Sequence, residues 1–530
     1  MLAGPLFLIV LPLTLAPVVY LLRRWALLAA SLASATTLVM ASLCWRLPLD
    51  RPLSVPGLTS VLGWKVALGE PMMVLGREFA LELAGCSTLG FIYLMAAVAF
   101  LFAWRISQGR LFFPLGLIIL SLVGAAVMIR HFLFAVLFLW IASIVAVFII
   151  QGDREGPRRG ALQYLVMVSL AIPPLLITPW LIDLQAVNLD NLALLRYATV
   201  LLAIGFAILL AVVPFHGWVS AVAVDAPPVV AAFVLTVANA VVLLLLLNLL
   251  QSYPWLSEDP QVFHLLRLGG LLMATVGGLL AFAQRDFSRL LGYAVLSDMG
   301  CTLVALGTAS PSALAAALLQ VTHRSVGLML TAMGLAVVRH RTGSDSFVNP
   351  STALRQAPGP LALVLDPLSL GQRTKGDKYR APGTKGSGQG SGHRLRGVAR
   401  HLPLSTAGLI LGGLSLAGMP LTAGFPSRWA IYRLLSGYHS PAPGLSQVLL
   451  KPGAGLALAM LLSGAGVAFG YLRGLSTLLG PSTEPKVKRE PFIASLMILG
   501  MIVLCIGLGL CPQWLLPPIE RVVESFSFLR

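Results

Sequence analysis

The sequence predicts an all-α polytopic membrane protein with about fourteen transmembrane helices. Three observations support this prediction. Hydrophobic residues make up 57% of the 530 residues, charged residues make up only 11%, and apolar runs of helical length repeat along the chain. Soluble domains usually carry about 25% charged residues. With so few charges, a soluble enzyme or a secreted binding module of this length is excluded, because each of its domains would need a polar surface.

The predicted spans follow from the length of each apolar run, because a helix needs about 20 such residues to cross a bilayer. The runs are 4–22, 25–43, 79–104, 111–129, 132–150, 161–181, 194–213, 227–250, 265–284, 289–308, 312–338, 404–436, 453–472 and 491–511. The twelfth run is long because glycine and proline interrupt it. The first run has no basic segment before it, and Arg23 and Arg24 follow it. We therefore expect a retained span rather than a secretory signal.

The loops between the runs alternate in charge, which predicts their orientation. Loops after the odd-numbered runs are basic, while those after even-numbered runs are short, neutral or acidic, as at Asp183 and Asp190. Positively charged loops stay in the cytoplasm. The pattern predicts a multi-pass protein of the cell (inner) membrane with both termini outside the cytoplasm. It also explains the net charge of +17 without invoking nucleic acid.

The five cysteines are scattered, and none shows the spacing of a metal site. We interpret them as small core residues. The sequence likewise carries no haem or iron–sulfur ligand spacing and no dinucleotide fingerprint. We therefore expect no metal, no cofactor and no redox centre in this chain.

Two breaks interrupt the apolar pattern, one in each half of the chain. The first is PFHGW at 214–218, followed by DAPP at 225–228; the second is GMP at 418–420, followed by GFP at 424–426. Paired broken segments in two halves are typical of transporters built from inverted repeats. Broken helices expose backbone groups that need polar partners, so ions could move there.

Ionisable residues within spans are costly and are therefore functional candidates. The candidates are Glu82 at the start of span 3, His216 after span 7, Asp298 in span 10, His323 and Arg324 in span 11, and Arg428 after the second break, with the polar Asn239 in span 8. Glu82 is near a span end, which favours an interface position over a role in proton transfer.

The residues around these breaks resemble a known family. PFHGW and DAPP resemble its PFHxWLPDAHxxAP signature, DFSRLLGY with SDMG at 286–300 resembles DxKRLLAYSSISHMG, His323 resembles the histidine of NHAxxK, and GVARHLP with GGLSLAGMPLTAGFPSRW at 397–429 resembles the stretch around its broken twelfth helix. From about span 4 to span 13, the chain is similar to the proton-conducting membrane subunits of NADH:quinone oxidoreductase (respiratory complex I) and of Mrp-type cation/proton antiporters.

The resemblance implies fourteen helices with two inverted five-helix repeats. We expect spans 1–3 at 1–110, the first repeat at 111–250, the second repeat at 265–340 and 402–475, a basic Gly-rich cytoplasmic linker at 341–401, and a C-terminal span and tail at 491–530. Residues 339–401 contain 11 basic and 3 acidic residues, a net charge of +8. This linker either only fixes the topology or forms a polybasic patch for anionic lipid or a partner.

The chain departs from this family at the positions that carry its proton path. The family's glutamate in helix 5 corresponds to Ile141, and its lysines in helices 7 and 8 correspond to Leu209 and Asn239. None of these side chains can titrate, whereas a buried lysine can lose its proton. The first repeat is therefore predicted to be non-conducting.

In the second repeat the family's pattern has also changed, but charge remains. Asp298 occupies the position of the family's histidine before Met-Gly, and Gly327 occupies that of the lysine of NHAxxK. Arg428 occupies the position of the lysine or glutamate of helix 12. Arg428 would be a fixed charge, Asp298 beside it would stay ionised, and His323 could titrate. The alternative is that the three only neutralise one another.

The resemblance favours an antiporter-like subunit of a proton-translocating NADH:quinone oxidoreductase-type complex, with other membrane subunits and the lipid bilayer as partners. Two alternatives remain open at this point. One is a non-conducting scaffold subunit of such a complex, favoured by the lost lysines and glutamate. The other is a stand-alone cation/proton secondary transporter, whose site would use Asn239, Asp298, His323 and Arg428.

Overall fold

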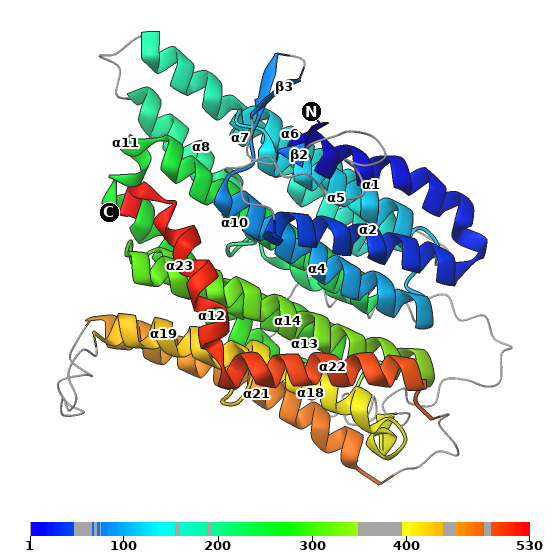
Figure 1. Cartoon of the computed structure of the whole chain (residues 1–530). Coiled ribbons are helices and arrows are strands. Elements are labelled where there is room, and N and C mark those ends of the chain that lie inside the picture. The colour runs from blue at the N-terminus through cyan, green and yellow to red at the C-terminus, as the bar shows by residue number, and fades with distance from the viewer. Residues whose placement is uncertain are drawn as a thin grey trace, which may run out of the picture.

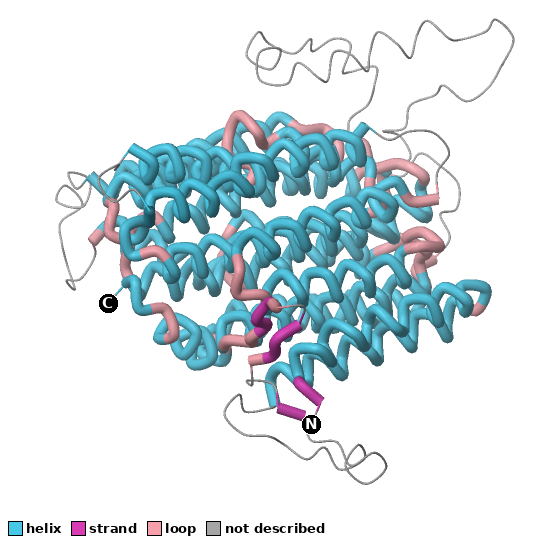
Figure 2. Tube along the Cα trace, turned by 90° about the horizontal axis from the view of Figure 1, so that it is seen from above, coloured by secondary structure: helices cyan, strands magenta, loops and turns pink. Residues whose placement is uncertain are grey.

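The computed structural model describes residues 2–46, 66–67, 71–74, 76–153, 159–187, 193–347, 395–437, 452–481 and 489–529. Helices fill this part of the chain and run side by side, with most connections gathered at their two ends (Figures 1 and 2). The helices are α1 (Gly4–Leu21), α2 (Ala26–Arg46), α4 (Leu83–Arg105), α5 (Phe112–Met128), α6 (Phe132–Gln151), α7 (Arg159–Val187), α8 (Ala193–Leu209), α9 (Gly217–Asp225), α10 (Pro228–Ser252), α11 (Pro254–Ser257), α12 (Pro260–Ala283), α13 (Phe287–Leu306), α14 (Pro311–Thr342), α18 (Pro403–Ala417), α19 (Gly424–Ser436), α21 (Pro452–Leu479), α22 (Phe492–Leu510) and α23 (Leu516–Glu524).

Eleven of the described helices are long and apolar enough to cross a membrane. Three shorter apolar helices, α5, α8 and α18, lie where the sequence predicts spans 4, 7 and 12. The predicted multi-pass helical fold is confirmed, while the count of fourteen crossings stays a prediction. The short helix α23 crosses the direction of the long helices and packs on α4 and α14 (Figure 1).

Both predicted breaks are present, and each lies in the fourth span of its five-helix repeat. In the first repeat α8 ends at Leu209 and α9 begins at Gly217. In the second repeat α18 ends at Ala417 and α19 begins at Gly424. Gly418 ends α18 in the left-handed conformation, with φ of 73°. Glycine adopts this conformation without the steric cost that other residues meet.

Two local features differ from the prediction. Span 3 was expected to begin at residue 79, but Arg77–Phe79 forms strand β4, which pairs with β3 (Met72–Val74), and α4 begins only at Leu83. A second pair of short parallel strands joins β1 (Leu2–Ala3) to β2 (Val66–Ala67). Gly76, at φ of 73°, allows the tight turn between β3 and β4. These strands are only two or three residues long, and the predicted all-α fold class is confirmed.

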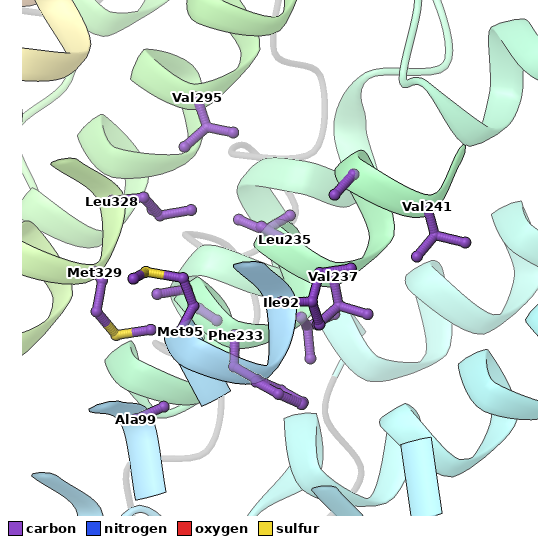
Figure 3. Close-up of a cluster of buried hydrophobic side chains, with 14 of the residues drawn as sticks. Ile92, Met95, Ala99, Phe233, Leu235, Val237, Val241, Val295, Leu328 and Met329 are labelled. Carbon is purple, nitrogen blue, oxygen red and sulfur yellow. The ribbon is translucent and has the colours of Figure 1, made fainter. Parts of the chain in front are cut away.

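The two repeats meet along an apolar seam. Helix α10 of the first repeat is buried along nearly its whole length and contacts α14 of the second repeat and α4. Figure 3 shows side chains from α4, α10, α13 and α14 pointing toward one another. The labelled residues are Ile92, Met95, Ala99, Phe233, Leu235, Val237, Val241, Val295, Leu328 and Met329. All of these side chains are apolar, so close packing rather than charge joins the repeats here.

The residues directly after α14 are bound to the start of α13. Phe287 N donates to Asp345 O at 3.0 Å, and Phe347 N donates to Arg285 O at 3.0 Å. The rings of Phe287 and Phe347 lie 4.7 Å apart, and Thr477 of α21 donates to Phe347 O. The first residues of the predicted linker are thus fixed, while its centre, 348–394, lies outside the described residues.

A pH-dependent contribution to stability is expected at this attachment. Burial first, and the Asp345 carboxylate second, raise the pKa of Asp286 above its ordinary value. A carboxyl with a raised pKa stabilises the fold below its unfolded pKa, and this contribution is lost as pH rises through the folded pKa.

Replacing Asp286 with asparagine is therefore expected to help the fold at high pH only. The melting temperature of Asp286→Asn minus that of the unaltered protein should be more positive at about pH 8 than at about pH 4. Thermal unfolding in detergent at both pH values measures this difference. An equal difference at both would contradict the raised pKa.

Candidate functional site

A buried ion pair lies at the break of the second repeat. Arg428 of α19 contacts Asp298 of α13, with 3.1 Å between Nη2 and Oδ1. Both residues are 0% exposed although 130 positions separate them in the sequence. From the sequence we expected that these two charges could pair, and in the structure they are in contact.

Arg428 also binds the end of the half-helix α18. Its guanidinium donates to Leu416 O at 2.6 Å and to Ala417 O at 3.0 Å. The last carbonyls of a helix lack partners within it and carry partial negative charge. Gly418 makes room for this contact, because a Cβ there would lie 2.2 Å from Arg428 Cδ. The break thus holds a cation between a carboxylate and a helix C-terminus.

A second arginine shares the same carboxylate. Arg324 Nη1 lies 3.5 Å from Asp298 Oδ2 and donates to Thr302 Oγ1 at 3.2 Å. Gln320, one turn earlier on α14, donates to Asp298 Oδ1. We call Asp298, Gln320, Arg324 and Arg428 the Asp298 cluster. One carboxylate and two guanidinium groups give it a net formal charge of one positive.

His323 borders this cluster without contacting Asp298. Its ring is fully buried, and Nδ1 lies 3.1 Å from Ser427 Oγ, beside Arg428 in the sequence. Ser427 Oγ also lies 3.3 Å from Gly424 O, to which it donates. Within the described part of the chain, His323 Nε2 has no hydrogen-bond partner. The predicted axis of Asp298, His323 and Arg428 is therefore an ion pair with a neighbouring imidazole.

The break of the first repeat holds an indole at the end of its first half-helix, where the second repeat holds a guanidinium group. Trp218 Nε1 donates to Ile208 O at 3.2 Å, the role that Arg428 has in the second repeat. Asp225 lies at the end of α9, where its Oδ2 accepts a 2.6 Å hydrogen bond from Gly160 N, near the start of α7. His216 is the N-cap residue of α9 and belongs to this break rather than to the Asp298 cluster.

The other residues singled out in the first half lie outside the Asp298 cluster. Asn239 is 3% exposed, and neither atom of its amide has a hydrogen-bond partner in the described chain. Leu209 is buried, whereas Ile141 is 43% exposed on the outer surface of its helix. Glu82 is the N-cap residue of α4, as its position near a span end suggested.

Sequence reasoning missed three members of this site. Arg324 was noted as a buried charge but not joined to Asp298, and Gln320 and Ser427 were not considered. A signal was available, because Gln320 and Arg324 lie four residues apart and so share one face of a helix. No group of three or more His, Cys, Asp or Glu that could hold a metal occurs among the described residues.

Comparison with known proteins agrees with this fold. Residues 129–365 match the family described as NADH:quinone oxidoreductase/Mrp antiporter, TM. Subunit N of the NADH-quinone oxidoreductase of Ectopseudomonas mendocina (strain ymp) is 31% identical over 329 residues, which cover 60% of this chain and 54% of that protein. Across three curated relatives, the chain covers 39%, 54% and 58% of their length.

Two solved structures share the fold over nearly the whole chain. A chain of the Mrp complex from Dietzia sp. DQ12-45-1b has a TM-score of 0.68 at 17% identity, covering 99% of this chain and 97% of that one. A chain of the archaeal membrane-bound sulfane sulfur reductase has a TM-score of 0.71 at 18% identity, covering 97% of this chain and 77% of that one. At such identities the likeness concerns the fold.

Proposed function

We propose that this chain, whose residues 129–365 match the NADH:quinone oxidoreductase/Mrp antiporter family, is an antiporter-like subunit of a proton-translocating NADH:quinone oxidoreductase-type complex. Subunit N of an NADH-quinone oxidoreductase, 31% identical over 329 residues, supports this. The observation that carries this proposal is the buried Asp298–Arg428 pair at the break of the second repeat. Buried charge within a membrane span is costly and is typical of ion pathways. Other subunits of the complex would carry the electrons.

The second repeat would handle the proton through His323. Arg428 cannot lose its proton under working conditions, and it remains a fixed charge. Asp298 is balanced by two guanidinium groups and serves as their counter-ion. His323 titrates near neutral pH in water and keeps one ring nitrogen without a described partner. A proton on His323 would be repelled by the net positive cluster, which favours its onward release.

The first repeat would not conduct. Its break is held by the indole of Trp218, which cannot exchange a proton with a neighbouring relay group at working pH. Asn239 and Leu209 stand where the family has lysines. With an apolar seam between the repeats (Figure 3), we propose that the second repeat acts alone and that the predicted domain boundaries apply.

The proposed location is the inner membrane, with both termini and the β3–β4 hairpin on the extracytoplasmic side. The alternation of basic and neutral loops supports this orientation. The start of the linker after α14 would then lie in the cytoplasm together with the turn between α12 and α13.

A second function, a non-conducting scaffold subunit, is favoured by one observation. Asp298 contacts Arg324, Arg428 and Gln320 together, so its charge is balanced within the cluster. Such a carboxylate stabilises the packing of α13, α14 and α19 without any transport. In that case His323 would be a buried neutral side chain.

Proton transport separates the two functions. Replacing His323 with glutamine keeps a hydrogen-bonding side chain beside Ser427 but removes the titrating ring. In vesicles containing the complete complex, His323→Gln is expected to slow proton uptake on the order of 10²-fold, the low end for a positioned proton-transfer group. The control is Asn239→Leu in the first repeat, which should leave uptake unchanged. If Asn239→Leu lost proton uptake while His323→Gln kept it, the first repeat rather than the second would be the conducting one.

The parent complex is tested by purifying the tagged protein in mild detergent and identifying what accompanies it by mass spectrometry. Quinone-reductase or hydrogenase-type subunits in stoichiometric amounts would support the proposal. Recovery of the chain alone, or with antiporter subunits only, would overturn the redox link and favour a stand-alone cation/proton transporter.

A further inference from the structure

Two buried cysteines lie against each other near the ends of neighbouring helices. Cys44 is two residues from the end of α2, and Cys86 lies in the first turn of α4. Cys86 Sγ donates to Cys44 O at 3.0 Å. Both are free thiols in this structure, with 6% and 2% of their surfaces exposed.

The close approach of the two helices holds this pair in place. Gly90 lies one turn beyond Cys86, and a Cβ there would be 3.1 Å from Cys44 Cβ and 2.8 Å from the indole nitrogen of Trp45. The absence of a side chain at Gly90 lets α2 and α4 approach closely at this level. A side chain at position 90 would push α2 and α4 apart, and it would separate the two cysteines with them.

The pair lies near the ends of its two helices, where the surface of the membrane is expected. Trp45, next to Cys44, is 52% exposed, and tryptophan is enriched at the boundary between lipid and water. Glu82, the N-cap residue of α4, precedes Cys86 by one turn. In the orientation proposed above, these helix ends lie outside the cytoplasm, where disulfides form and persist.

We propose that Cys44 and Cys86 form a disulfide bond in the mature protein. The two thiols would lose two protons and two electrons to the disulfide of an extracytoplasmic thiol oxidase, which is reduced to its dithiol. The bond would close the segment of chain between the two helices, 42 positions apart. Such a bond acts mainly by restricting the unfolded chain. This inference depends on the orientation of the chain and not on its proposed function.

The remaining cysteines provide internal controls. Cys301 is fully buried in the middle of α13. Cys505 lies in α22 and Cys511 directly follows it. Six residues apart along a helix, these two point to different faces, so they are not expected to bond each other.

The test uses the unaltered full-length protein in its membranes. Samples are quenched with acid, free thiols are blocked with N-ethylmaleimide in denaturant, and disulfides are then reduced and labelled with a maleimide-linked polyethylene glycol. We expect two labels per chain, located by peptide mass spectrometry at Cys44 and Cys86. Cys44→Ser and Cys86→Ser should each abolish the labelling, whereas Cys505→Ser should leave it unchanged.

Three results would overturn the proposal. They are blocking of all five thiols before reduction, labels at another pair, and labelling that Cys44→Ser does not affect. Cells that lack extracytoplasmic thiol oxidase activity supply a second measurement, because the labels should disappear there. The outcome for the unaltered protein stands even if a serine variant fails to fold.

Discussion

Replacing Asp298 with asparagine is expected to lower the stability of the folded protein by about 3–5 kcal/mol, the usual effect of removing one partner of a buried ion pair. The carboxylate is the counter-ion of both Arg324 and Arg428, at 3.5 and 3.1 Å. Without it, two buried guanidinium groups would remain with no opposite charge. The measurement is the thermal unfolding of the purified protein in detergent.

Two further variants make this result specific. Asp259→Asn makes the same chemical change at the half-buried N-cap of α12, where asparagine is an equally good cap, and should cost little. Adding Arg324→Gln to Asp298→Asn restores the original net charge of the cluster and should recover part of the lost stability. If Asp298→Asn were as stable as the unaltered protein but lost transport, the carboxylate would be a relay group rather than a structural counter-ion.

Replacing Gly424 with alanine is expected to disrupt the break of the second repeat. A Cβ at Gly424 would lie 1.9 Å from Ser415 O, a backbone atom of α18. Backbone cannot give way as a flexible side chain can, so α19 would have to move. Overpacking typically costs about 1–3 kcal/mol and occasionally more, and we expect the upper end here.

The displacement should also reach Arg428, which lies one turn beyond Gly424 on α19. Its hydrogen bonds to Leu416 O and Ala417 O depend on the present distance between the two half-helices. The matched control is Gly500→Ala in α22, where a Cβ would meet nothing within 4 Å. That variant should be neutral or slightly stabilising, since alanine favours helices by about 0.5–1 kcal/mol over glycine. Equal unfolding temperatures for the two variants would contradict this reading.

The fold could largely be predicted because its main signals are local. Apolar runs, alternating loop charge and the Gly/Pro interruptions at 418–426 each act within one segment of the chain. The exceptions were also local, but of a kind that composition does not reveal. Helix α7 continues through Pro173, Pro174 and Pro179 to Val187, and the hairpin before α4 depends on a turn at Gly76.

The site was harder to predict because it depends on how the helices are rotated against one another. The sequence identified Asp298 and Arg428 as buried charges, but their contact required α13 and α19 to face each other. His323 and Arg324 are adjacent in the sequence, yet one hydrogen-bonds Ser427 and the other contacts Asp298. Neighbouring positions on a helix point in different directions, and no pattern in a single sequence fixes those directions.

The anchoring of Arg428 to the end of α18 also has a consequence for the response to membrane voltage. Moving one elementary charge across the membrane changes its energy by ~2.3 kcal/mol for each 100 mV of membrane potential. A charge that does not move gains nothing from the potential. Arg428 is tied to two backbone carbonyls and to Asp298, so its charge is stationary unless the half-helices move together. It would contribute a constant field but no gating charge, and any voltage dependence of transport through this repeat would come from the ion that crosses.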